Sequence, residues 1–224
     1  MKKLIVSLGL ALTLSFGATL DEGAKAFEKG DYKTALQIFE ELSYKNNAKA
    51  KYNLGVMYEN GYGVKQDYLK AKEWWEKAAA QGLADAQYNL GVIYINGQGV
   101  KQDYKKAIEW YEKAAAQGYA LAQYNLGVMY SKGEGVKQDY FKAKEWYEKA
   151  AAQGDIHAKY NIGVLYYNGQ GVKQDYKKAK EWYEKAAAQG YALAQYNLGV
   201  MYSNGLGVKQ DYFKAKEWYE KAAA

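Results

Sequence analysis

The chain has 224 residues, with 25 acidic side chains and 31 basic ones, all of them lysine, and a formal net charge of +6. It contains no cysteine, which excludes a disulfide framework, a thiolate zinc site, an iron–sulfur cluster and a cysteine nucleophile. Proteins that read nucleic acids favour arginine, whose planar group grips phosphates and guanine edges, so an all-lysine composition argues against nucleic acid as a partner.

Residues 1–17 have the pattern of a secretory signal peptide. Two lysines follow Met1, an apolar run covers residues 4–14, and small residues follow at the spacing that predicts cleavage near Gly17–Ala18. The run is shorter than the roughly 20 apolar residues of a permanent span, although an uncleaved anchor is the alternative. No cysteine follows the run, which excludes a lipoprotein anchor. We therefore expect a periplasmic or secreted protein that is not an integral membrane protein once processed.

One sequence pattern recurs every 36 residues through most of the chain. Each copy holds the motif Tyr-Asn-(Leu/Ile)-Gly-Val, which begins at Tyr52, Tyr88, Tyr124, Tyr160 and Tyr196. Self-similarity at a period in the thirties is typical of a solenoid, in which each supersecondary unit packs on its neighbours.

Each copy is predicted to begin with an amphipathic helix and a glycine turn. In the second copy, Ala86, Leu90 and Tyr94 recur at helical spacing and predict a first helix over residues 86–95. Gly97 and Gly99 then provide the positive φ angles that a tight reversal needs. A phosphate-binding loop would need a preceding strand or a Gly-Lys-Ser/Thr motif, so these glycines are predicted to be structural.

The second helix of each copy is predicted to follow an aspartate. Asp103 suits the N-cap position of a helix that runs to about Gln117 and ends at Gly118. Tyr94 of the first helix and Tyr104 and Trp110 of the second are expected in the core, and Glu109 is expected to pair with Lys113. On the solvent side, Leu69, Phe141 and Phe213 take a position that Lys105 and Lys177 fill in other copies; isolated exposed apolar residues need no function.

The spacing of these residues resembles the Sel1-like repeat, a relative of the tetratricopeptide repeat with a longer Gly-x-Gly-Val loop between its helices. The resemblance covers five repeats of 36 residues over residues 50–224. Residues 18–49 resemble a tetratricopeptide-type hairpin, because Gly30-Asp31-Tyr32…Ala35 falls in phase with Gln66-Asp67-Tyr68…Ala71. The resemblance implies an all-α fold, a right-handed α-solenoid (superhelix) of about a dozen helices.

A stripe of polar and aromatic residues on the first helices is a candidate peptide-binding groove. At about 100° per residue, Tyr88 and Val92 fall opposite the core side of their helix, with Asn89 at its margin. In solenoids of this class that side lines the concave groove, where rings offer contact area and carboxamides can pair with a peptide backbone. The alternative is that these residues are the repeat consensus, with asparagine bonding across the seam between repeats. The groove residues are Tyr52, Asn53, Val56, Tyr88, Asn89, Val92, Tyr124, Asn125, Val128, Tyr160, Asn161, Val164, Tyr196, Asn197 and Val200.

The residues offer no catalytic constellation. The single histidine, His157, is placed in an inter-repeat turn and is expected to be a surface residue. No serine is followed by lysine three positions later. We predict no catalytic residue, no cofactor and no metal site. The resemblance itself implies a rival interpretation, because exported cysteine-rich Sel1 proteins are described as β-lactamases or penicillin-binding proteins. This chain lacks their paired cysteines.

We therefore expect an exported, non-enzymatic repeat scaffold that binds a protein or peptide in its concave groove. The alternatives are penicillin-binding or β-lactamase-type activity, and a role in cell-wall or polysaccharide assembly, since rows of tyrosine can stack on a glycan. After Ala222-Ala223-Ala224 the Gln-Gly of earlier copies is missing. The last apolar face is therefore expected to support end-to-end self-association, to be covered by a partner, or to be continued by further chain.

Overall fold

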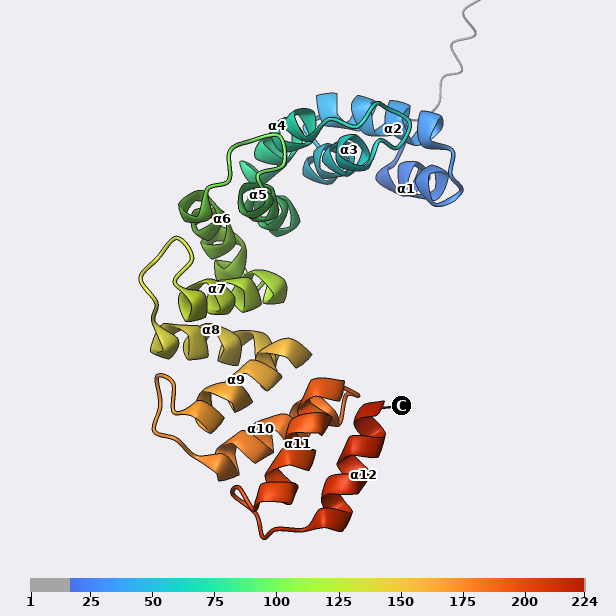
Figure 1. Cartoon of the computed structure of the whole chain (residues 1–224). Helices are drawn as coiled ribbons and strands as arrows, with labels where there is room; N and C mark the ends of the chain where they lie inside the picture. The colour runs from blue at the N-terminus through green and yellow to red at the C-terminus, as the bar shows by residue number, and fades with distance from the viewer. Residues whose placement is uncertain (1–16, 224) are drawn as a thin grey trace, which may run out of the picture. The chain divides into compact units, whose positions relative to one another are not determined.

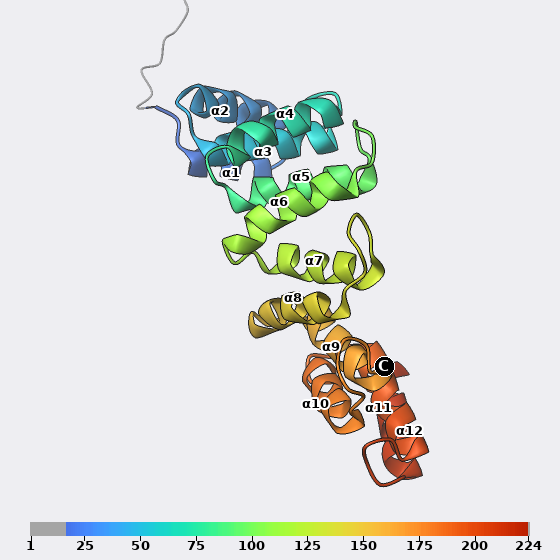
Figure 2. The same ribbon diagram turned by 90° about the vertical axis from the view of Figure 1, so that its left-hand side faces the viewer.

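Short helices joined by glycine turns make up the described chain. The computed structural model describes residues 17–223 and forms twelve α-helices and no strand within them, so the all-α prediction is confirmed (Figures 1 and 2). Apart from Gly17, the predicted signal peptide lies outside the described residues. The chain divides between Trp74 and Trp75 into two compact units, called unit 1 and unit 2.

Unit 1 contains one complete helical hairpin and most of a second, whose last residues belong to unit 2. Its helices are α1 (Leu20–Glu28), α2 (Tyr32–Tyr44), α3 (Ala48–Asn60) and the first part of α4 (Tyr68–Ala79). The helices bury a shared core because their small and large apolar residues recur on one side. The core residues are Ala35, Phe39, Leu42, Ala50, Leu54 and Met57.

Unit 2 is a tandem array of hairpins in which each helix packs against the next along the chain, and α7 also touches α9. After the end of α4, its helices are α5 (Ala84–Asn96), α6 (Tyr104–Ala116), α7 (Ala120–Lys132), α8 (Tyr140–Ala152), α9 (Ile156–Asn168), α10 (Tyr176–Ala187), α11 (Ala192–Asn204) and α12 (Tyr212–Ala223). Since neighbouring hairpins share their apolar faces, no hairpin buries its core alone.

The helix boundaries follow the predicted signals. Helix α5 contains the predicted segment 86–95, and it ends at Gly97, whose φ of 66° is in the left-handed region that glycine adopts without strain. The Asp103 carboxylate accepts the backbone N–H of Lys106 at 3.1 Å and caps α6. The same bond recurs at Asp139, Asp175 and Asp211 with oxygen–nitrogen distances of 3.0 Å.

We expect Asp139→Ala to lower the free energy of unfolding by about 1 kcal/mol, because it leaves an orphan N–H at the start of α8. Urea unfolding followed by circular dichroism would measure this loss. Asp85→Ala is the matched control, since Asp85 lies in the first turn of a helix that no side chain caps. Equal losses for the two variants would contradict a specific capping role.

In the second and later repeats, the core is built from alanine, leucine and tyrosine, whereas in the first repeat Trp75 is fully buried at the position that Tyr111 takes in the second. Ala86, Leu90 and Tyr111 are buried, and Tyr94 is nearly so. The prediction that Tyr104 and Trp110 belong to the core is wrong, since both are only partly buried at its margin.

A lysine one turn later lies over the ring of the tryptophan in each of the last four repeats, at Trp110, Trp146, Trp182 and Trp218. The Lys113 ammonium lies 4.0 Å from the centre of the Trp110 ring, and so covers this ring instead of pairing with Glu109 as predicted. Lys149 lies 3.9 Å from the centre of the Trp146 ring, and Lys185 lies 4.0 Å from that of Trp182. A cation over an indole is favourable, so the tryptophans need not be fully buried.

None of the helices in residues 17–223 is long and apolar enough to cross a membrane.

Candidate functional site

The predicted groove residues lie on the first helix of each repeat. Those of the first repeat lie on α3 in unit 1, and the others lie on α5, α7, α9 and α11 in unit 2. All are half-buried except Tyr196, which is 53% exposed. In unit 2, α7, α9 and α11 each pack between two second helices, which cover part of the surface around them.

In unit 1, the three predicted residues of α3 line a cavity of about 250 Å³. Tyr52, Asn53 and Val56 form one side of this cavity, which is called the unit 1 pocket. The other side comes from the N-terminal hairpin, whose contributing residues are Ala24, Phe27, Glu28 and Phe39. These four were not predicted. The only sequence signal for them was that aspartate, tyrosine and alanine have the same spacing in the N-terminal hairpin as in the repeats.

In unit 2, the predicted tyrosines pack on aromatic rings of neighbouring helices. The centre of the Tyr88 ring lies 5.6 Å from that of Tyr111 on α6 and 5.1 Å from that of Tyr119, just before α7. Burial raises the pKa of the Tyr88 hydroxyl, and the nearby Asn125 amide partly opposes this rise. Tyr160 repeats this arrangement, 5.6 Å from Tyr183 and 5.2 Å from Tyr191. The rings therefore contribute to packing between repeats as well as to the surface.

Three of the predicted asparagines interact with tyrosines of the preceding repeat. The Asn197 amide donates to the Tyr160 hydroxyl at 3.3 Å. Burial raises the pKa of Tyr183, and the Asn197 amide partly opposes this rise. Burial also raises the pKa values of Tyr124 and Tyr147, and the Asn161 amide partly opposes both rises. Asn125 repeats the pattern with Tyr88 and Tyr111. These three amides take part in the seam between repeats; that they also contact a ligand stays a prediction.

His157 is exposed at the start of α9. Its ring lies 5.8 Å from Tyr124 and 5.1 Å from Tyr191, the latter in an edge-on arrangement. Over residues 17–223, no group of three or more histidine, cysteine or acidic side chains is arranged to hold a metal ion.

The comparison with protein families identifies the repeat. The Sel1 repeat model matches five consecutive segments, residues 48–83, 84–119, 120–155, 156–191 and 192–224. The chain belongs to the Sel1 repeat family. Its first Sel1 repeat begins with α3, and its N-terminal hairpin, α1 and α2, precedes the repeats.

Two solved structures show the same fold as this Sel1 repeat chain. The crystal structure of c5321, a protective antigen of uropathogenic Escherichia coli strains with an SLR fold, is 39% identical with a TM-score of 0.88. A Sel1 repeat protein from Oxalobacter formigenes is 34% identical, also with a TM-score of 0.88. The predicted family and solenoid fold are thereby confirmed.

The extent of each match differs. The present chain is covered to 91% by the Escherichia coli protein and to 92% by the Oxalobacter one. It spans 44% of the length of the former and 84% of the latter. A search of the curated proteins finds no match to this Sel1 repeat sequence.

Proposed function

We propose that this chain is an exported, non-enzymatic scaffold that binds a protein or peptide against the first helices of its hairpins. Sel1 repeat scaffolds typically mediate protein–protein interaction, and this chain has five such repeats. Export rests on the signal-peptide pattern of residues 1–17. The observation that carries the binding proposal is the unit 1 pocket.

The unit 1 pocket has the size and lining of a site for one apolar side chain. Its volume of about 250 Å³ is below the roughly 300–1,000 Å³ that is usual for small-molecule sites. Phe27, Tyr52 and Val56 give it apolar walls. A leucine, methionine or aromatic side chain of a partner would remove these walls from water, which is the main source of affinity in peptide grooves.

Two polar groups at the same pocket favour a peptide over a free hydrophobic molecule. The Asn53 amide can donate to a peptide carbonyl and accept from a peptide N–H, so it can hold a backbone beside the pocket. The exposed Glu28 carboxylate favours a partner with a basic residue next to its apolar anchor. In unit 2, the exposed edge of Tyr196 offers further contact area.

A linear peptide library panned on the chain beginning at Ala18 tests this proposal. We expect the enriched peptides to combine an apolar residue with a basic one, and Asn53→Ala or Val56→Gln to weaken their binding by about tenfold or more. Fluorescence anisotropy with the synthetic peptides would measure the affinities. Asn125, Asn161 and Asn197 are unsuited to this test because their amides interact with tyrosines at the seam.

Val64→Gln serves as the control, since Val64 is a half-buried valine of unit 1 that does not line the pocket. Circular dichroism would show that all variants keep their helices. The proposal fails if no peptide is enriched, or if the pocket variants bind the enriched peptides as tightly as the unaltered chain does.

A further inference from the structure

One edge of unit 2 gathers the loops between paired helices and the first turns of the second helices. It consists of four eleven-residue segments, 96–106, 132–142, 168–178 and 204–214, and is called the loop edge. The loops follow one another along the same side of unit 2 in Figure 1. The predicted peptide-binding positions lie outside these segments, so the loop edge is a separate surface.

The loop edge is continuous because each loop packs on the preceding segment. A Cβ atom on Gly171 would lie 2.7 Å from the backbone nitrogen of Phe141, and one on Gly207 would lie 2.9 Å from that of Lys177. Gly135 approaches the Tyr104 backbone in the same way. The chain at residues 104, 140–141 and 176–177 therefore lies against the loop of the next repeat. Positions 105, 141, 177 and 213 recur every 36 residues along this edge.

The positive charge of unit 2 is concentrated on this edge. The four segments contain eleven lysines and five acidic residues, whereas the rest of unit 2 contains nine lysines and eleven acidic residues. Four of the five acidic residues are the capping aspartates, whose carboxylates already accept backbone N–H groups. The edge therefore presents a surplus of ammonium groups to an anionic partner.

Aromatic rings alternate with lysines at positions 105, 141, 177 and 213. Phe141 is 58% exposed and Phe213 is 85% exposed, at the position that Lys105 and Lys177 fill in the other two segments. Tyr212, next to Phe213, is 66% exposed. A soluble polyanion would need the lysines alone. Exposed phenylalanines among lysines match an interface where headgroup phosphates lie above acyl chains.

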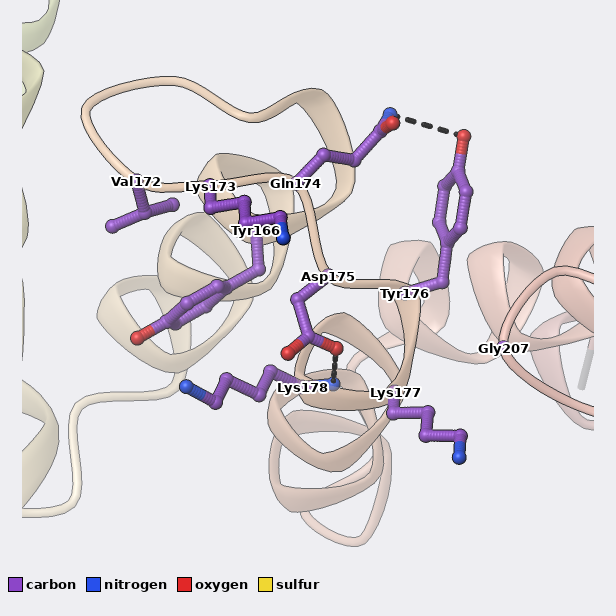
Figure 3. Close-up of a pocket in the computed structure, with 9 residues that line it drawn as sticks. All are labelled: Tyr166, Val172, Lys173, Gln174, Asp175, Tyr176, Lys177, Lys178 and Gly207. Carbon is purple, nitrogen blue, oxygen red and sulfur yellow. Dashed lines mark hydrogen bonds between the residues drawn. The ribbon is translucent and has the colours of Figure 1, made fainter.

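A hollow of about 650 Å³ in the third segment could receive a headgroup (Figure 3). Its lining includes three lysines, Lys173, Lys177 and Lys178, and one acidic residue, Asp175, whose carboxylate accepts the backbone N–H of Lys178. The other lining residues are Tyr166, Val172, Gln174, Tyr176 and Gly207. The Lys178 ammonium lies 5.3 Å from the centre of the Tyr166 ring. Figure 3 shows the Lys177 side chain extending away from Tyr166, whereas that of Lys178 extends toward it. Lys177 and Lys178 therefore extend in different directions from the first turn of α10.

We propose that the loop edge docks the protein onto an anionic phospholipid bilayer. The lysines contact the headgroup phosphates, and Phe141 and Phe213 enter the interface between headgroups and acyl chains. None of the helices α1 to α12 crosses the bilayer in this arrangement. The proposal is independent of the peptide-binding function, because it uses different residues and a different partner.

Sedimentation with large unilamellar vesicles tests the proposal, using the chain beginning at Ala18. We expect binding to vesicles of equal parts phosphatidylglycerol and phosphatidylcholine, little binding to phosphatidylcholine alone, and weaker binding in about 0.5 M salt. The pair Lys105→Gln and Lys177→Gln, and separately the pair Phe141→Ser and Phe213→Ser, are each expected to reduce binding roughly tenfold or more.

Matched pairs away from the loop edge serve as controls. Lys113→Gln with Lys185→Gln removes the same charge, and Leu121→Ser with Leu193→Ser removes exposed apolar side chains from the starts of α7 and α11. Both control pairs should change binding less than twofold. The proposal is overturned by the absence of vesicle binding, by equal losses in the control pairs, by unchanged binding of the phenylalanine pair, or by binding to heparin without binding to vesicles.

Discussion

Gly127→Ala is expected to be among the most destabilising single substitutions in unit 2. Gly127 lies in α7, and a Cβ atom there would stand 2.5 Å from two ring carbons of Tyr147 on α8. The Tyr147 ring is buried, so it cannot move aside without separating the two helices. We expect a net loss of about 3 kcal/mol in the free energy of unfolding, after allowing for the better helix propensity of alanine.

Thermal and urea unfolding would measure this loss, and a double-mutant cycle would assign it. If the clash with the ring is the cause, Gly127→Ala should cost much less when Tyr147 is already alanine. Gly154→Ala is the control for a general effect of replacing glycine. A Cβ atom on Gly154 would meet nothing within 4 Å, and its φ of 99° limits the cost to local strain. Equal costs for Gly127→Ala in the two backgrounds would refute the packing explanation.

The same contact explains which part of the core could be predicted from the sequence. Helical spacing places Ala86, Leu90 and Gly91 on the core side of α5, and the structure buries them. Spacing could not choose between Trp110 and Tyr111, because adjacent residues differ by only 100° around a helix. The choice depends on Gly91 of the facing helix, which leaves room for the Tyr111 ring. Such a pairing depends on two helices together, so the spacing of apolar residues along one helix does not predict it.

The sequence predicted which helices and which positions form the candidate site, but not what surrounds those positions. Helical phase grouped Tyr52, Asn53 and Val56 on one helix surface, and all three line one pocket. A projection of a single helix treats every direction away from its own core as solvent. In unit 2, the next repeat covers part of that direction, so Tyr88 and Tyr160 pack on tyrosines beyond their own helices. The role of these residues in binding stays a prediction.

The loop edge shows a similar limit. The alternation of Leu69, Lys105, Phe141, Lys177 and Phe213 is visible in the sequence, where each apolar residue looks isolated. Within unit 2, the contact of each loop with the preceding second helix joins the last four positions into one surface. That contact depends on the backbone paths of two repeats, which a reading of one repeat does not give.

Alkaline pH is expected to unfold unit 2, because three of its buried tyrosines resist ionisation as long as the chain is folded. Burial raises the pKa of Tyr147 from 10.0 to about 12, and burial also raises the pKa of Tyr111 and Tyr183 well above the ordinary value. Below pH 10 these phenols are neutral in both the folded and the unfolded chain, so their packing contributes fully. Between pH 10 and 12 the unfolded chain loses these protons while the folded chain keeps them.

The free energy of unfolding should therefore fall by up to about 1.4 kcal/mol per pH unit for each of these tyrosines in that range. Circular dichroism would follow the loss of helix, and phenolate absorbance would follow ionisation. We expect the buried fraction of the phenols to ionise together with unfolding.

Tyr147→Phe removes one of the three titrations and should move the alkaline transition to higher pH. The Tyr147 hydroxyl donates to Ser131 Oγ at 3.3 Å, and the Ser131 hydroxyl itself donates to the Val128 carbonyl at 2.9 Å. Because Ser131 keeps its own bond to Val128, the substitution leaves little hydrogen-bonding capacity unpaired. Tyr212→Phe is the matched control, since its exposed phenol should not affect the transition. If Tyr147→Phe and the unaltered chain lose helix at the same pH, the phenol of Tyr147 does not limit stability. The alkaline transition would then originate at Tyr111, at Tyr183 or outside the buried tyrosines.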